Sequence, residues 1–447
     1  MSRAAMFEFP RSRSGSVSGI HRGLTVRGVV MFFVGALLMA SASEQVREFC
    51  SRLVLGRSTG GVLIHPFLFP LAAAFPLLAV ARLALVHSRL VLLFLGFAGW
   101  YFASTFYGGV GLTEGVKIAT SILTVATMAL LVTSWEDFVA ATTGMCIGVG
   151  SLAVLGIVRS EGVGIEIIQA ANRNTFSLYG LPVLLLGGYV LARGGRTSLT
   201  TRFIITAMLS AVALATMLTL NRSGWLGMAI VAGMLLPQGR KQNIVLLLVA
   251  VPACFFYFSE QTRIEGIRDR VISTQVGLES DRLRLELARH SFEIAMEVPL
   301  LGVSPQKLPY ELARRLGYPG SQLETHNVFA HLAAGSGVPA LVLLIAIAVV
   351  LWRWKPSIPL NGAERVRFLQ SRNLMRMVLV LWAVRGLFSH EILYSPAFCM
   401  ALGLSLGLCL RFNRMPKGLF GLTGGKSRPL PAAAGRRRRQ LRTFTSI

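Results

Sequence analysis

Residues 324–350, ETHNVFAHLAAGSGVPALVLLIAIAVV, join a polar segment to a long apolar one. From Leu332 to Val350 no residue carries a charge, and a helix of about 20 such residues crosses a hydrocarbon core of about 30 Å. Two histidines, His326 and His331, stand where the polar part ends. The stretch therefore predicts a membrane-spanning helix with titratable side chains at its mouth.

Comparable apolar runs recur along nearly the whole chain. Hydrophobic residues make up 53% of the 447 positions, and the mean hydropathy is +0.60, well above the usual values for a soluble domain. We predict an all-α, polytopic membrane protein with about twelve transmembrane helices and one large periplasmic loop that contains an amphipathic helix. The predicted spans begin near Val26, Val62, Leu90, Gly115, Phe138, Thr175, Phe203, Gly224, Asn243, Leu332, Asn373 and Ser395.

Basic residues concentrate on one side of the predicted membrane. The net charge is +25, and Lys and Arg gather in both tails and after the second, sixth, eighth and tenth spans. The positive-inside rule then puts both termini in the cytoplasm and the 260–325 loop outside. One loop, at residues 135–137, is acidic where the rule expects basic residues.

These patterns predict five regions. Residues 1–25 form a basic cytoplasmic tail, and residues 26–259 hold spans one to nine. Residues 260–331 form the large outside loop, and residues 332–411 hold spans ten to twelve. Residues 412–447 form a basic cytoplasmic tail that we expect to be disordered. The GRRRRQLR run in the last region suits anionic lipid better than nucleic acid, so no nucleic-acid partner is expected. An uncleaved first span is favoured, although Met39-Ala40-Ser41-Ala42 also suits a signal-peptide site.

The predicted spans carry few ionisable residues. A transporter coupled to ions usually carries such residues in mid-span, whereas here the main exception is Arg385, with Lys117 near a span end. Arg385 either snorkels to the surface or lines a polar cavity, and the sequence leaves both readings open. The five cysteines have no metal or redox spacing and are expected to be small core residues.

The outside loop is predicted to hold one helix. In SDRLRLELARHSFEIAMEVP (280–299) the residues Leu285, Ala288, Phe292 and Ala295 follow helical spacing, a cap at Ser280 or Asp281 starts the helix and Pro299 ends it. We expect it to lie at the outer membrane surface. Arg282 and Arg289 fall on its polar side with Arg284 nearby; a solvated charged face is the plainer reading of these arginines.

The two histidines are unsuited to a shared metal. Five residues apart, His326 and His331 diverge by about 140° around a helix, whereas zinc pairs lie four apart. Neither a metal nor a cofactor is expected. His331 is expected to be a hydrogen-bonded helix residue, while His326 lies at the junction of loop and span. Guanidinium groups suit diphosphate oxygens and a neutral imidazole can accept a hydroxyl proton, which together indicate glycosyl transfer from a lipid diphosphate.

Three stretches in order resemble the O-antigen ligase and polysaccharide polymerase superfamily. They are LNRSGWLGMAI (220–230), RLELARHSFEIAMEVPLLGVSP (284–305) and THNVFAHLAAGSGVPALVLL (325–344), within a likeness that covers about residues 160–411. Two positions depart from the family pattern: Ala288 stands where an aromatic residue is common, and Ser304 replaces a loop glycine. Both departures concern the acceptor pocket.

The resemblance implies roles for individual residues. Arg222 and Arg284 would bind the undecaprenyl diphosphate of the donor, and His326 would activate the acceptor hydroxyl in a metal-independent, inverting transfer. Further substrate-binding candidates are Arg282, Arg289, Asn327, Asn174, Asn172 and Arg385. For Asn172 and Asn174, helix capping is an equally good explanation.

The main hypothesis is an inner-membrane glycosyltransferase of cell-surface polysaccharide biosynthesis with its active site on the periplasmic side of a bacterial cytoplasmic membrane. Its implied partners are an undecaprenyl-diphosphate-linked glycan donor, a glycan or lipid A core acceptor, membrane lipid and other polysaccharide-assembly proteins. Polymerase and ligase both remain open. The alternatives are a lipid-linked glycan flippase or other multi-span transporter, and a structural membrane scaffold.

Overall fold

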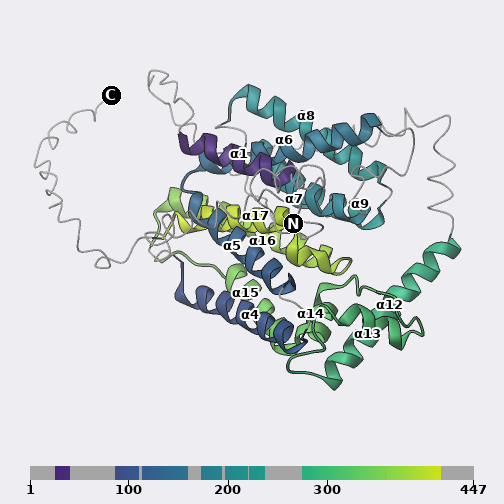
Figure 1. Ribbon diagram of the computed structural model, residues 1–447. Helices are drawn as coiled ribbons and strands as arrows, with labels where there is room; N and C mark the ends of the chain where they lie inside the picture. The colour runs from purple at the N-terminus through teal and green to yellow at the C-terminus, as the bar shows by residue number, and fades with distance from the viewer. Residues whose placement is uncertain are drawn as a thin grey trace, which may run out of the picture. The chain divides into compact units, whose positions relative to one another are not determined.

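The computed structural model describes residues 26–40, 86–109, 113–159, 173–193, 197–219, 221–236, 274–357 and 359–413. Within these ranges the chain forms helices and no strand, as the all-α prediction requires (Figure 1). The protein is a polytopic helical membrane protein.

We describe the helices in chain order, first those coloured purple to teal in Figure 1 and then those coloured green to yellow. The earlier helices are α1 (Val26–Ala40), α4 (Ser88–Tyr107), α5 (Thr113–Leu131), α6 (Trp135–Arg159), α7 (Arg173–Ala192), α8 (Leu199–Leu218) and α9 (Arg222–Leu235). The later ones are α12 (Thr274–Glu297), α13 (Leu308–Arg315), α14 (Val328–Ser336), α15 (Val338–Trp352), α16 (Gly362–Gly386), the 3-10 helix η2 (His390–Tyr394) and α17 (Pro396–Leu410).

Several of these helices suit a bilayer by length and composition. Four candidate spans lie in α4, α5, α6 and α8, and shorter apolar helices run over Phe176–Ala192, Ser223–Leu235, Val338–Trp352 and Pro396–Leu410. The spans predicted near Val62 and Asn243 lie outside the described residues, so the count of about twelve stays a prediction. Every other predicted start lies in a described helix or one residue before it.

The tenth predicted span is broken near its start. Gly337 has φ +83°, and a Cβ there would lie 1.8 Å from the Leu300 carbonyl oxygen, so only glycine fits. The chain therefore ends α14 at Ser336 and begins α15 at Val338, whose N–H donates to the Pro299 carbonyl (2.8 Å). The apolar helix starts six residues after the predicted Leu332 because this turn separates it from the buried helix α14.

Helix α16 begins well before the predicted Asn373. Its start at Gly362 is set by a capping box, in which the Asn361 side chain accepts from the Glu364 N–H and the Glu364 carboxylate accepts from the Asn361 N–H. The turns of α16 before Asn373 contain charged residues, so a prediction based on runs of apolar residues does not include them.

The helix ends fall into two groups, and contacts within each group show which ends lie together. At the loop end, Ser104 near the end of α4 donates to the carbonyls of Leu301 (2.6 Å) and Gly335 (3.0 Å). At the basic end, His87 before α4 contacts the Lys355 carbonyl (3.4 Å) and the Trp354 ring beyond α15. Helices α4 and α15 therefore run antiparallel, as alternating spans require.

The acidic residues 135–137 belong to the basic end. Trp135 packs near Tyr189, whose hydroxyl donates to the Gln370 carbonyl in the charged part of α16. Asp137 accepts from the backbone N–H groups of Thr133 (2.9 Å) and Ser134 (3.0 Å). A carboxylate is stabilised at a helix start, so Asp137 is explained by the beginning of α6 rather than by membrane orientation.

The predicted loop helix exists but is longer than expected. Helix α12 begins at Thr274, before the predicted caps, and ends at Glu297. Its protein-facing side is Leu287, Ser291, Ile294 and Ala295, which are all buried, whereas Leu285 and Phe292 of the predicted stripe are 72% and 50% exposed. That exposed apolar strip is the side available to a membrane surface.

Candidate functional site

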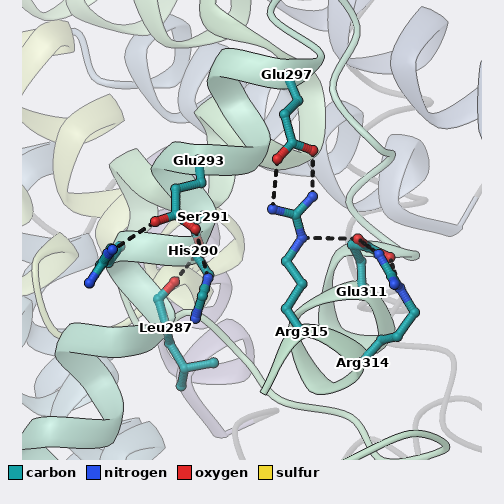
Figure 2. A network of polar contacts seen from close by, with 9 residues as sticks. Leu287, His290, Ser291, Glu293, Glu297, Glu311, Arg314 and Arg315 are labelled. Atoms are coloured by element: carbon teal, nitrogen blue, oxygen red, sulfur yellow. Dashed lines mark hydrogen bonds and ion pairs between the residues drawn. The ribbon is translucent and has the colours of Figure 1, made fainter. Parts of the chain in front are cut away.

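The platform of the site is the pairing of α12 with α13, which Figure 2 shows. Arg315 binds both carboxylate oxygens of Glu297 (2.9 and 2.5 Å) and also donates to Glu311 (3.0 Å), which in turn pairs with Arg314. Hydrogen bonds from Arg315 and Arg314 hold the pKa of Glu297 and Glu311, respectively, below the ordinary range. This bidentate network fixes the end of α12 against α13.

The three predicted arginines of α12 separate into two groups. Arg282 pairs with Glu286 (3.2 Å) and Arg289 with Glu293 (3.0 Å), and both arginines are well exposed. Arg284 is also exposed, but its charge acts on His326 and on Arg385. Of the three, Arg284 is thus the one whose charge acts on other candidate residues.

His326 has a special backbone and a special environment. It is half-buried, with φ +49°, a left-handed conformation that few non-glycine residues adopt and that recurs at functional sites. Burial first, and then the charge of Arg284, lower the pKa of His326, while Glu324 acts in the opposite direction. The imidazole is therefore neutral near pH 7 and able to accept a proton.

Asn327 holds the next helix in place. Its side-chain oxygen accepts from the N–H groups of Phe329 (2.9 Å) and Ala330 (3.1 Å), so it is the N-cap of α14. The predicted substrate contact of Asn327 therefore shares this oxygen with a structural role.

Arg385 is buried rather than snorkelling. It is 1% exposed, and its guanidinium donates to the hydroxyls of Ser177 in α7 and Ser223 in α9, each at 2.6 Å. Asn221 caps α9 by accepting from the Ser223 N–H (3.1 Å). Arg385 thereby fixes the helix start on which Arg222 is the first residue.

Two of the predicted residues, Arg222 and Asn174, are described in part, and a third, Asn172, is not described. The backbone of Arg222 begins α9 and that of Asn174 lies in the first turn of α7, while their side chains are outside the description. Asn172 lies outside the described residues altogether.

Two further histidines lie beside this site. The His331 and His390 rings stack with centroids 4.6 Å apart and planes 22° apart, and Glu324 approaches His390 Nδ1 at 4.0 Å. His390 also acts on the pKa of His326, which a protonated His390 ring would lower, so the three imidazoles share one region. The nearness of His390 to the other histidines depends on packing between helices, which local sequence patterns do not show.

Lys117 completes the region from the side of α5. It pairs with Glu114 (2.5 Å) and lies over the Tyr394 ring (5.4 Å), and the Tyr394 hydroxyl bonds that of Tyr101. Sequence reasoning noted only that Lys117 is near a span end. Among the described residues, no group of three His, Cys, Asp or Glu side chains could hold a metal ion.

An apolar crevice starts next to these polar groups. It is lined by α4, α5, α15, α16 and α17, with η2 at one end. Ile118 and Leu393 of its wall are the chain neighbours of Lys117 and Tyr394. Polar and apolar binding surfaces therefore adjoin at the loop end.

Residues 205–345 match the family model described as O-Antigen ligase. The match is shorter than the likeness expected over about 160–411, but it includes all three motif stretches and the residues Arg222, Arg284 and His326. No curated protein matches the chain.

Proposed function

Since residues 205–345 make this chain a member of the O-antigen ligase superfamily, we propose that it transfers a glycan from an undecaprenyl-diphosphate-linked donor to a hydroxyl acceptor. The chain is O-antigen ligase-like and acts in polysaccharide assembly. The donor, the acceptor and a location at the periplasmic face of the inner membrane belong to the proposal.

The observation that carries the proposal is the neutral His326 imidazole within reach of the Arg284 charge. In the proposed step, a hydroxyl oxygen of the acceptor attacks the anomeric carbon and its proton passes to His326. The bond from that carbon to the diphosphate oxygen breaks, and the diphosphate leaves with the electron pair. Arg284 and Arg222 balance the charge that develops on the leaving group.

The apolar crevice supports a lipid-linked donor. Its wall is almost wholly apolar, and it begins beside the polar groups of Lys117 and Tyr394. A molecule with a long hydrocarbon tail and a charged head suits such a junction of surfaces. This arrangement favours chemistry at one membrane face over a polar path across the bilayer, and so favours an enzyme over a flippase.

The test is complementation of a deletion strain with wild type, His326→Ala and the control His87→Ala. Lipopolysaccharide is examined on gels, and exopolysaccharide is quantified. A bare lipid A core with accumulated lipid-linked polymer identifies a ligase, and single repeats or lost exopolysaccharide identify a polymerase. Full complementation by a stably inserted His326→Ala variant would overturn the base role and bring the transporter forward.

A further inference from the structure

A second polar group lies beside the residues of the proposed transfer and includes His390. We define the inner polar cluster as His331, His390, Lys117, Glu114 and Tyr394, which come from α14, η2 and α5. The proposed transfer uses none of these side chains. Their convergence from three separate elements needs its own explanation.

Two atoms of the inner polar cluster have no hydrogen-bond partner within the described part of the chain. They are His331 Nε2 and His390 Nδ1, on the two stacked rings. His331 is 5% exposed and the His390 side chain 12% exposed. Buried polar atoms are nearly always satisfied in folded proteins, so this pair indicates polar groups of a ligand.

The charge of the inner polar cluster suits an uncharged ligand. Lys117 and Glu114 cancel each other across 2.5 Å, and burial lowers the pKa of His390 to about 4, so its ring is neutral at physiological pH. The arginine side, by contrast, is cationic and suits a diphosphate. A sugar offers hydroxyls that donate and accept, which matches neutral imidazoles, a tyrosine and an internal ion pair.

We propose that the inner polar cluster binds the acceptor sugar, with His390 and Lys117 holding its hydroxyls so that one of them faces His326. This inference rests on the proposed glycosyl transfer. The unpartnered His331 Nε2 is a further contact for the same sugar, and the His331 ring also holds the His390 ring by stacking. The ligand class is an uncharged sugar unit, whether it comes from a lipid-linked repeat or from the lipid A core.

The test uses the purified full-length protein with lipid-linked glycan extracted from the parent strain as donor. Two acceptors are compared, a single lipid-linked repeat that carries an isotopic label to distinguish it from the donor, and the lipid A core. The variant His390→Phe keeps a ring to stack on His331 but removes the hydrogen bonds. Its KM for the acceptor should rise about tenfold, the equivalent of one lost hydrogen bond, while the KM for the donor stays within about twofold.

Matched variants make the result specific. His390→Gln should recover much of the acceptor affinity because an amide still hydrogen-bonds, and Lys117→Met should copy the acceptor effect of His390→Phe. The control is His87→Phe at the basic end, where the histidine contacts Trp354 and the Lys355 carbonyl, and it should leave both KM values unchanged. If His390→Phe does not fold, Lys117→Met decides.

An equal rise in donor and acceptor KM, or no change in either, would overturn the acceptor assignment. Failure of the transfer itself looks different, because wild type would then make no product with either acceptor. An acceptor-specific effect with either the repeat or the core supports the inference, and the acceptor that responds reveals its source.

Discussion

At the scale of single residues, His326 lies under two opposing charges. Arg284 disfavours its protonated form, while Glu324 favours it, and burial adds to the effect of Arg284. A general base must be unprotonated to act, so under the proposed transfer the acidic limb of the rate profile should report the pKa of this imidazole. Its neighbours should shift that limb in opposite directions.

Substitution of the two charges tests this directly. Glu324→Gln removes a negative charge, lowers the pKa of His326 and should move the acidic limb of kcat/KM to lower pH. Arg284→Gln raises that pKa and should move the limb of the remaining activity to higher pH. Both shifts are read from pH profiles of purified protein at low salt, with Glu286→Gln as the control. Shifts in the same direction would contradict the assignment.

Arg385 offers a second prediction at this scale. Arg385→Ala removes two charge-assisted hydrogen bonds of about 1.5–3 kcal/mol each, so the free energy of unfolding should fall by roughly 3 kcal/mol. Arg385→Lys should also fail, since a point charge cannot span Ser177 and Ser223. Thermal unfolding in detergent measures the loss. Arg376→Lys is the control, because Arg376 hydrogen-bonds a single acceptor, the Trp352 carbonyl. An equal loss of stability in this variant would argue against the requirement for a guanidinium that binds two hydroxyls at position 385.

Sequence reasoning reached some of these residues and not others. His326 and Arg284 stand in recognisable local patterns, and the structure brings them within range of each other's charge. His390 and Lys117 are 273 positions apart, from 117 to 390, and only helix packing brings them together. The left-handed backbone of His326 likewise leaves no mark in composition or periodicity.

At the scale of elements, the close contact of α17 with α5 depends on glycine. A Cβ at Gly403 would lie 2.6 Å from the Val125 carbonyl oxygen, and one at Gly407 would lie 2.8 Å from that of Ala129. The backbones approach this closely because neither glycine has a side chain, and α17 is buried along most of its length.

Gly403→Leu should therefore separate the two helices. Overpacking of a close contact costs about 1–3 kcal/mol or more, so we expect a lower melting temperature and a smaller yield of monodisperse protein. Gly233→Leu in α9 is the matched control, because a Cβ there meets nothing within 4 Å. Equal behaviour of the two variants would refute the glycine-dependent contact.

The α12–α13 platform should be sensitive to acid. The pKa values of Glu297 and Glu311 are lowered in the folded state, so their contribution is present above the unfolded carboxyl pKa of about 4.3 and is lost as pH falls through the folded values. Hydrogen exchange of residues 308–315 should accelerate in that range. Glu297→Gln should exchange fast already at pH 7, whereas Glu286→Gln should not.

Element boundaries show what the sequence could and could not predict. The helical periodicity of the sequence predicts that α12 exists. Which side of α12 is buried depends on its contacts with α14, and that side does not include Leu285. The break at Gly337 was missed because an uncharged run looks continuous, and it is the neighbouring Leu300 carbonyl that forces the turn.

At the scale of the whole molecule, the described charges agree with the alternation of helix ends. Arg353, Lys355 and Arg411 lie at the basic end, where the Ser357 N–H donates to Asn413 beyond α17 (3.1 Å). Hydropathy and charge were sufficient for the helical, polytopic class. The predicted spans near Val62 and Asn243 remain predictions, as does the orientation in the membrane.

Orientation can be measured with thiol labelling. In a cysteine-free background, Lys307→Cys at the loop end should react with a membrane-impermeant reagent on intact cells, and Lys355→Cys at the basic end should react only after permeabilisation. The reverse pattern would invert the proposed topology and place the transfer in the cytoplasm. Labelling in detergent, where both positions are accessible, is the control.

The turn at Gly337 also bears on membrane thickness. Apolar helices adjust to thicker or thinner bilayers by changing tilt. If α14 and α15 were one continuous helix, a change of tilt would also move His331. The turn instead separates the two helices, and α14 is held by hydrogen bonds from the N–H groups of residues 303 and 304 to the carbonyls of Ala334 and Gly335. His326 and His331 precede this turn, so we expect a change in the tilt of α15 to reach them less than it would through one continuous helix.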